Sequence, residues 1–278
     1  MVFNSSIITT HELATALNDK SIVLLDCTID KVGQSLRDER LELIPNSLFF
    51  DIEGKLSDKS SKLPHTLVSC EIFEQEMQVL GINQNSTVVL YDRWGIYSSP
   101  RAWWMFKVMG FDYVYILNGG LPAWKADNFT LTTAYVEPIE KGNFNANFRE
   151  SWYADKNYIL ENYQKDSIQI FDARSKARFT GVAPEPRQGL KSGHIPHSNN
   201  IPFEELLNGN YYLNKEKISD IFQIQKSTNK EIIFTCGSGI TASILAFASH
   251  LIEQEKIRVY DGSWSDWGME EHNLPIEK

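Results

Sequence analysis

The sequence of 278 residues predicts an α/β protein made of two tandem domains, each a parallel sheet with helices on both faces. The first observation behind this prediction is an internal repeat, in which four segments recur in the same order. The second is that short, continuously apolar runs alternate with longer amphipathic stretches, as in parallel sheets covered on both sides. The third is length, since a chain of this size holds about two domains at ~100–200 residues each.

The repeat pairs segments of the two halves of the chain. Each half has an apolar run that ends at an aspartate, Asp26 in SIVLLDCTID and Asp172 in SIQIFDARSK. STVVLYDRWGIYSSPRAWWMF resembles KEIIFTCGSGITASILAFA, and this alignment sets Asp92 opposite Cys236. The other two pairs are ELIPNSLFFDIE with GHIPHSNNIPFEEL, and YILNGGLPAWKADNFTL with RVYDGSWSDWGMEEHNL. We therefore expect two homologous domains.

The apolar runs predict three buried strands in each half. They are residues 21–25, 87–91, 113–117, 168–171, 231–235 and 257–260. Helical periodicity covers residues 70–82, with Gly81 as the expected stop, and residues 242–254. The polar stretch between the halves lacks clear periodicity. We place a linker at residues 141–152, between an N-terminal domain at 1–140 and a C-terminal domain at 153–278.

Composition excludes two classes of function. The formal net charge is −9, the isoelectric point is about 5.2, and no dense run of Lys and Arg occurs, which argues against nucleic-acid binding. An acidic protein can still hold a local pocket for a small anion. No run approaches the ~18 apolar residues that span a membrane, and the N-terminus does not read as a signal peptide. We expect a cytoplasmic protein without membrane or nucleic-acid partners.

The three cysteines, Cys27, Cys70 and Cys236, are far apart and form no C-x-x-C pair. This spacing argues against a disulfide framework or a zinc site, and no metal or organic cofactor is implied. Cys236 differs from the other two because it directly follows a predicted strand and precedes a predicted helix. Ligands of open α/β sheets bind beyond the carboxyl ends of the strands. Cys27 and Cys70 are interpreted as structural.

The loop after Cys236 favours a reactive thiolate. Gly237 and Gly239 allow a compact turn, whose N–H groups and following helix N-terminus attract negative charge. The thiolate is the nucleophilic form of cysteine. In the first repeat the same position is Asp92, which would be an odd counterpart for a cysteine that only packs in the core. One active and one inactive domain explain the pair better.

The loop CGSGITA, residues 236–242, resembles the active-site loop of tandem-domain rhodanese-type sulfurtransferases, in particular the 3-mercaptopyruvate sulfurtransferases. DARSKARFTGVAPEPRQGLKSGHIPHSNNIPF, residues 172–203, is similar to the second-domain signature of that family. PRAWWMFKVMGFDYVYILNGGLPAW, residues 100–124, is similar to the first-domain signature. The resemblance covers nearly the whole chain. It implies two rhodanese-like domains, of which the first is catalytically inactive.

The resemblance also implies a two-step reaction. Cys236 attacks the sulfur of 3-mercaptopyruvate and forms a persulfide, pyruvate leaves, and a thiol, thioredoxin or cyanide accepts the sulfur. Family members that prefer thiosulfate usually carry basic residues at the second and third loop positions. Here these positions are Gly237 and Ser238, so the neutral loop favours 3-mercaptopyruvate.

Two arginines match family residues that bind the substrate carboxylate, Arg178 and Arg187. The planar guanidinium suits this role because it holds a carboxylate with two parallel hydrogen bonds. Three loop residues are expected to complete the substrate site, Gly237, Gly239 and Ile240.

A proton relay described for the family matches Ser238, His65 and Glu53. This chain departs from the family pattern because the acid is Glu53 rather than aspartate, with one extra residue before the histidine. Thr241 supplies a second loop hydroxyl, which can hydrogen-bond a sulfur anion or a carbonyl oxygen. We expect these four side chains to contribute to catalysis.

Two alternatives to this function remain open at this stage. A thiosulfate sulfurtransferase would use the same cysteine with a different donor. A non-catalytic rhodanese-like binding module would not form a persulfide, although such modules tend to lose the cysteine. The sequence argues against a cysteine phosphatase, because its loop needs an arginine six positions after the cysteine and that position is Ala242.

Overall fold

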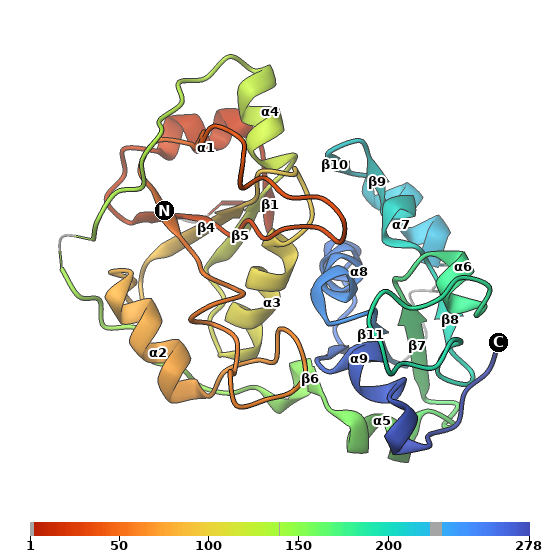
Figure 1. Ribbon diagram of the computed structural model, residues 1–278. Helices are drawn as coiled ribbons and strands as arrows, with labels where there is room; N and C mark the ends of the chain where they lie inside the picture. Colours follow the sequence, from red (N-terminus) through yellow and green to blue (C-terminus); the bar gives the residue numbers. More distant parts are fainter. Residues whose placement is uncertain (1–2, 139, 223–229) are drawn as a thin grey trace. The chain divides into compact units, whose positions relative to one another are not determined.

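The computed structural model describes residues 3–138, 140–222 and 230–278. Its contacts divide the chain into two compact units (Figure 1). The first unit holds the chain up to Asp58, Val68–Phe148 and Gly209–Tyr212. The second unit holds Lys59–Leu67, Arg149–Asn208 and Leu213–Lys278. Each unit therefore combines a long stretch of one half of the chain with a short segment of the other half.

The first unit is built on a five-stranded sheet in the order β1-β5-β4-β2-β3, and every pairing is parallel. Its strands are β1 (Ile7–Ile8), β2 (Ile22–Asp26), β3 (Ser47–Phe49), β4 (Thr87–Tyr91) and β5 (Val114–Leu117). Its helices are α1 (Thr10–Ala16), α2 (Cys70–Val79), α3 (Ser99–Val108) and α4 (Gly120–Ala126). The three strands predicted in this half are confirmed as β2, β4 and β5.

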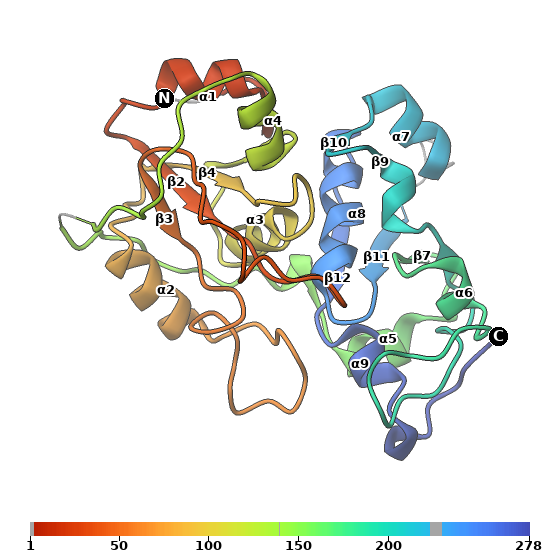
Figure 2. The ribbon, with the colours of Figure 1, turned by 45° about the horizontal axis from the view of Figure 1, so that its top comes forward.

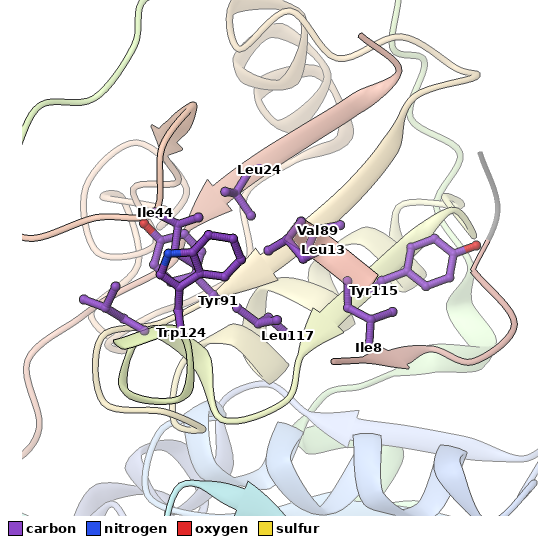
Figure 3. Packing of buried hydrophobic residues seen from close by; sticks show 10 residues of the cluster. Ile8, Leu13, Leu24, Ile44, Val89, Tyr91, Tyr115, Leu117 and Trp124 are labelled. Atoms are coloured by element: carbon purple, nitrogen blue, oxygen red, sulfur yellow. The ribbon is translucent and has the colours of Figure 1, made fainter. Parts of the chain in front are cut away.

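Helices cover both faces of this sheet, as predicted. Leu13 of α1 and Trp124 of α4 belong to one buried cluster with the strand residues Val89 and Tyr91 (Figure 3). On the other face, Phe73 of α2 and Phe106 of α3 meet edge to face. Since alternate strand residues point to opposite faces, the continuously apolar strand β4 supplies side chains to both layers.

The second unit repeats the same plan with the sheet order β6-β12-β11-β7-β8, again entirely parallel. Its strands are β6 (Tyr153–Ala154), β7 (Ile168–Asp172), β8 (Asn199–Asn200), β11 (Glu231–Thr235) and β12 (Ile257–Tyr260). Its helices are α5 (Lys156–Asn162), α6 (Lys176–Phe179), α7 (Lys215–Phe222), α8 (Ile240–Leu251) and α9 (Ser263–Trp267). It also holds the short strand β9 (Leu207–Asn208) and the 3₁₀ turns η1 (Glu150–Trp152), η2 (Phe203–Leu206) and η3 (Glu270–His272), whereas β10 (Tyr211–Tyr212) lies in the segment assigned to the first unit.

Both faces of the second sheet are also covered. Ile159 of α5 and Trp264 of α9 pack with Ile233 of β11 on one face. On the other face Phe222 of α7 lies edge to face against Phe234 of β11. β11 is the central strand of this sheet, so the loop that follows it lies at the middle of the carboxyl edge.

Several element ends differ from the prediction for local reasons. Helix α8 begins at Ile240, two residues before the predicted start, because Gly239 adopts a left-handed φ of 80° as its N-cap. Helix α2 ends at Val79, and Gly81 follows in the left-handed region at φ 74°. The strands β1, β3, β6 and β8 were not predicted, since runs of two or three residues carry no readable periodicity.

The first part of the predicted linker is attached to the first unit. Residues 141–149 contain no helix or strand. The amide of Gly142 donates to Gln78 O at 2.8 Å, and the amide of Phe144 donates to Ile82 O at 3.0 Å. The Phe144 side chain is fully buried. This stretch is therefore an irregular but packed segment.

The two aspartates that end β2 and β7 are both fully buried but are neutralised differently. Asp172 pairs with Arg174, two residues downstream. Asp26 instead accepts a hydrogen bond from Tyr135 Oη at 2.8 Å and lies 3.7 Å from Arg93 Nε. Burial raises the pKa of Asp26, although these partners oppose the shift.

No helix in the described ranges is long and apolar enough to cross a membrane.

Candidate functional site

The loop that carries Cys236 joins β11 to α8 in the second unit (Figure 2). Cys236 directly follows the last strand residue, Thr235, and only 2% of it is exposed to solvent. The left-handed Gly239 turns the chain into α8, and Ser243 Oγ in the first turn of the helix donates to Gly239 O at 2.9 Å. The thiol therefore lies where ligands of open α/β sheets bind.

The start of α9 holds the Cys236 loop through several hydrogen bonds. The amide of Cys236 donates to Ser263 Oγ at 3.1 Å, and its carbonyl accepts from the amide of Trp264 at 2.9 Å. The carbonyl of Gly237 accepts from both the amide of Ser265, at 2.9 Å, and its hydroxyl, at 2.6 Å. The loop backbone is thus fixed from the side of β12.

Of the predicted relay residues, the structure brings Ser238 and His65 together. Segment Lys59–Leu67 belongs to the second unit, and His65 Nδ1 lies 3.0 Å from Ser238 Oγ. His65 adopts a left-handed φ of 59°. The amide of Leu67 donates to the buried carboxylate of Asp261 at 2.9 Å, which anchors the segment beside the loop. Glu53 is an exposed residue of the first unit, and its place as the third relay member stays a prediction.

Arg178 lies next to the loop and is oriented by a buried ion-pair network. Its guanidinium pairs with Glu185, whose side chain is 1% exposed and which also pairs with Arg174. Arg174 in turn pairs with Asp172 and stacks on the ring of Trp264, with 4.2 Å between its guanidinium carbon and the ring centre. Burial alone would lower the pKa of Arg174, but the two carboxylates hold it above its ordinary value.

Gly237 provides the space in which the Arg178 guanidinium lies. A Cβ atom added to Gly237 would lie 3.1 Å from Arg178 Nη2, which is tighter than an ordinary van der Waals contact. About a quarter of the Arg178 side chain remains exposed (24%), so it keeps donors for a ligand. Arg178 can therefore lie where it does because Gly237, at the second loop position, has no side chain.

The remaining predicted site residues lie around the same loop. Arg187 Nη1 donates to Ser265 Oγ at 3.3 Å, so Arg187 is connected through this hydroxyl to the Gly237 carbonyl. Ile240 is buried as the first residue of α8, and Thr241 is half-buried as the second. Every predicted site residue except Glu53 thus belongs to the second unit.

The equivalent loop of the first unit shows what such a loop binds. Asp92 Oδ2 accepts hydrogen bonds from the amides of Tyr97, Ser98 and Ser99, at 2.9, 3.0 and 3.0 Å. It also accepts one from the Ser99 hydroxyl at 2.8 Å, and Oδ1 accepts one from the amide of Trp94 at 3.1 Å. The converging donors hold a fully buried carboxylate, so this loop geometry is an anion cradle.

The other two cysteines lack a comparable setting. Burial raises the pKa of the Cys27 thiol well above its ordinary value, and Asp26 and Asp92 add to the shift. Burial also raises the pKa of Cys70. Both shifts disfavour the thiolate. Within residues 3–138, 140–222 and 230–278, no group of three or more His, Cys, Asp or Glu side chains is placed to hold a metal ion.

Sequence reasoning missed four residues that shape this site, namely Arg174, Glu185, Ser263 and Ser265. A signal for the two serines was available in the repeat. Aligning YILNGGLPAW with RVYDGSWSDW sets Ser263 opposite Gly120 and Ser265 opposite Pro122. For Glu185 no such signal existed, because nothing in its local sequence shows that its carboxylate is buried between two arginines.

Comparison with known proteins gives consistent matches over most of the chain. The family described as rhodanese-like domain matches residues 9–127 and 155–270. The chain is 38% identical to the 3-mercaptopyruvate sulfurtransferase of Escherichia coli K12, covering 95% of both sequences. It is 37% identical to the human 3-mercaptopyruvate sulfurtransferase, over 88% of this chain and 84% of that one.

Solved structures of related proteins also match over most of the chain. The crystal structure of SseA from Escherichia coli, a 3-mercaptopyruvate sulfotransferase of rhodanese fold, matches with a TM-score of 0.83 at 35% identity, over 95% of this chain and all of that one. The Tum1 protein of Saccharomyces cerevisiae matches with a TM-score of 0.87 at 28% identity, over 99% and 98% of the two chains.

Proposed function

The chain belongs to the rhodanese family and is similar along most of its length to 3-mercaptopyruvate sulfurtransferases, and from this we propose its reaction. The enzyme takes sulfur from 3-mercaptopyruvate, carries it as a persulfide on Cys236, and passes it to a thiol acceptor such as thioredoxin, or to cyanide. Pyruvate is the first product. The second unit performs the chemistry, and the first unit, with Asp92 at the equivalent position, is catalytically inactive.

The proposed chemistry balances without a cofactor. The Cys236 thiolate attacks the substrate sulfur, an S–S bond forms, and the bond between sulfur and the substrate methylene carbon breaks. The electron pair of that bond leaves with the carbon as the enolate of pyruvate. The substrate thiol proton is lost from sulfur, and one proton is gained by the carbon that becomes the methyl group. The products are pyruvate and an anionic persulfide.

The observation that carries this proposal is the anion cradle of the first unit. The repeat sets Thr241, Ala242 and Ser243 opposite Tyr97, Ser98 and Ser99, the residues whose amides surround Asp92. A loop of the same origin around Cys236 can direct its amides toward the attacking sulfur and toward the persulfide that forms on it. Preorganised amides stabilise negative charge because they need not reorient as it develops.

We assign the substrate carboxylate to Arg178 and Arg187. Arg178 is supported because Glu185 fixes its orientation while part of the guanidinium stays open. Arg187 is supported by its link through Ser265 to the Gly237 carbonyl. Gly237 leaves the space that Arg178 needs, and Gly239 and Ile240 form the start of α8 next to the loop.

Proton transfer to the leaving enolate is assigned to Ser238 with His65. The 3.0 Å contact between Ser238 Oγ and His65 Nδ1 supports this pair. Thr241 is the second hydroxyl of the loop and is proposed to hydrogen-bond the substrate carbonyl oxygen. Glu53 stays a prediction for the third relay member. The cytoplasmic location and the thioredoxin-type acceptor are likewise predictions, and three free cysteines accord with a reducing compartment.

The donor preference is tested by measuring sulfur transfer to one thiol acceptor from 3-mercaptopyruvate and from thiosulfate, side by side. We expect a much higher kcat/KM with 3-mercaptopyruvate, because Gly237 and Ser238 add no positive charge for a dianionic donor. A higher kcat/KM with thiosulfate would keep Cys236 as nucleophile and overturn the assignment of the donor. Activity with neither donor would support the binding-module alternative.

Substituting Gly237 by alanine is expected to raise KM for 3-mercaptopyruvate roughly threefold with little change in kcat. The new Cβ would lie 3.1 Å from Arg178 Nη2, so the guanidinium must move by a few tenths of an ångström. The measurement is steady-state kinetics of the purified variant beside its thermal midpoint. An unchanged KM would show that the fit between Gly237 and Arg178 does not affect substrate binding.

A further inference from the structure

Ser263 adopts a backbone conformation that serine rarely takes. Its φ is 50°, in the left-handed region, and its side chain is fully buried. The repeat counterpart, Gly120, has nearly the same φ of 51°. Left-handed backbone costs serine free energy that glycine does not pay. A serine at this position therefore needs a compensating interaction.

The hydroxyl of Ser263 makes such an interaction with the nucleophile loop. It accepts a hydrogen bond from the amide of Cys236 at 3.1 Å and donates one to Tyr260 O at 2.7 Å. Two residues later, Ser265 donates to Gly237 O through both its amide and its hydroxyl, and that hydroxyl accepts from Arg187 at 3.3 Å. We call Ser263 and Ser265 the serine clamp.

The first unit cannot form the same clamp. Glycine at position 120 has no hydroxyl, and proline at position 122 has neither a hydroxyl nor an N–H. A Cβ atom on Gly120 would lie 2.4 Å from Asp92 O, so the loop of the first unit also leaves no room for a serine. Both units share one backbone hydrogen bond to the first loop residue. The amide of Leu121 donates to Asp92 O in the first unit, and the amide of Trp264 donates to Cys236 O in the second. The clamp is thus specific to the loop that carries the thiol.

We propose that the serine clamp positions the catalytic loop, with a separate task for each serine. Ser263 fixes the Cys236 backbone and so the direction of its sulfur. Ser265 fixes the Gly237 carbonyl and the Arg187 guanidinium, and so the binding of the substrate carboxylate. Both are positioning residues rather than catalytic ones. The proposal rests on the proposed function, in which Cys236 is the nucleophile and Arg187 binds substrate.

The test uses Ser263→Gly, Ser265→Ala and a matched control, Ser249→Ala, in the full chain. Ser263→Gly removes the hydroxyl but also relieves the left-handed strain, so the thermal midpoint should stay close to that of the parent. We expect its kcat and the rate of Cys236 alkylation by iodoacetamide to fall about tenfold with KM unchanged. Ser265→Ala should instead raise KM for 3-mercaptopyruvate severalfold, with the alkylation rate unchanged.

The control removes a buried serine hydroxyl that takes no part in the clamp. Ser249 lies in α8, and its Oγ has no hydrogen-bond partner among the described residues, so Ser249→Ala should leave both readouts unchanged. The proposed role of the clamp would be overturned if Ser263→Gly kept the kcat and the alkylation rate of the parent. It would also be overturned if both values fell only in proportion to a lower thermal midpoint. Failure of the proposed function would appear separately, as sulfur transfer that persists in Cys236→Ser.

Discussion

Replacing Cys236 by serine is expected to abolish sulfur transfer from 3-mercaptopyruvate. The serine hydroxyl fits the same space, but it is not ionised at neutral pH and cannot form a persulfide. The loop that orients the side chain would remain, since its contacts to Ser263 and Trp264 involve only the backbone of residue 236. The variant therefore tests the chemistry of the thiol and leaves the fold intact.

Two measurements check this expectation. The first is pyruvate release in the steady state, and the second is the mass of the protein after treatment with substrate, which should rise by one sulfur atom in the parent but not in Cys236→Ser. Cys70→Ala is the matched control and should keep both signals, because burial raises the pKa of Cys70 and disfavours its thiolate. Persulfide on the Cys236→Ser variant would transfer the role to another cysteine.

Replacing Arg178 by alanine is expected to raise KM for 3-mercaptopyruvate by roughly 10- to 150-fold. The variant loses a charge-assisted contact to the substrate carboxylate, worth about 1.5–3 kcal/mol. Stability should fall less than for most buried ion pairs, because Glu185 keeps Arg174 as a partner 2.8 Å away. Substrate binding and folding can therefore be separated in this variant.

The measurement is KM and kcat of Arg178→Ala beside Arg178→Lys and Lys176→Ala. Lysine keeps the charge but loses the planar fork, so Arg178→Lys should fall between the parent and the alanine variant. Lys176 is exposed on the same helix, α6, and its loss should leave KM unchanged. Equal KM in Arg178→Ala and the parent would contradict the carboxylate assignment.

The two repeats differ at the second loop position and in how their buried aspartates are paired. In the first unit, Arg93 at the second loop position lies beside the buried Asp26, 3.7 Å away. In the second unit Arg174, from the strand end itself, neutralises Asp172, and the second loop position is Gly237. That change frees the space beside the loop, and Arg178 occupies it.

The fold class, the repeat and the place of Cys236 directly after a central strand could all be predicted from the sequence. These features depend on residues that are close together along the chain. Apolar runs form buried parallel strands, and the glycine-rich loop that follows such a strand places Cys236 at the carboxyl edge of the sheet. Six predicted strands appear in the structure, and Asp92 opposite Cys236 was readable from the alignment alone. The short edge strands could not be predicted, since runs of two or three residues show no periodicity.

Which distant side chains meet at the loop depends on tertiary packing and could not be predicted from local patterns in the sequence. His65 reaches Ser238 from 173 positions away, and Glu185 orients Arg178 through a carboxylate whose burial no local pattern reveals. The proposed role of Ser263 also depends on the folded chain, because its left-handed φ and its hydrogen bond to the Cys236 amide exist only there. Such contacts depend on how the strands and helices pack together. Sequence patterns reflect only residues that are close along the chain, so they do not predict these contacts.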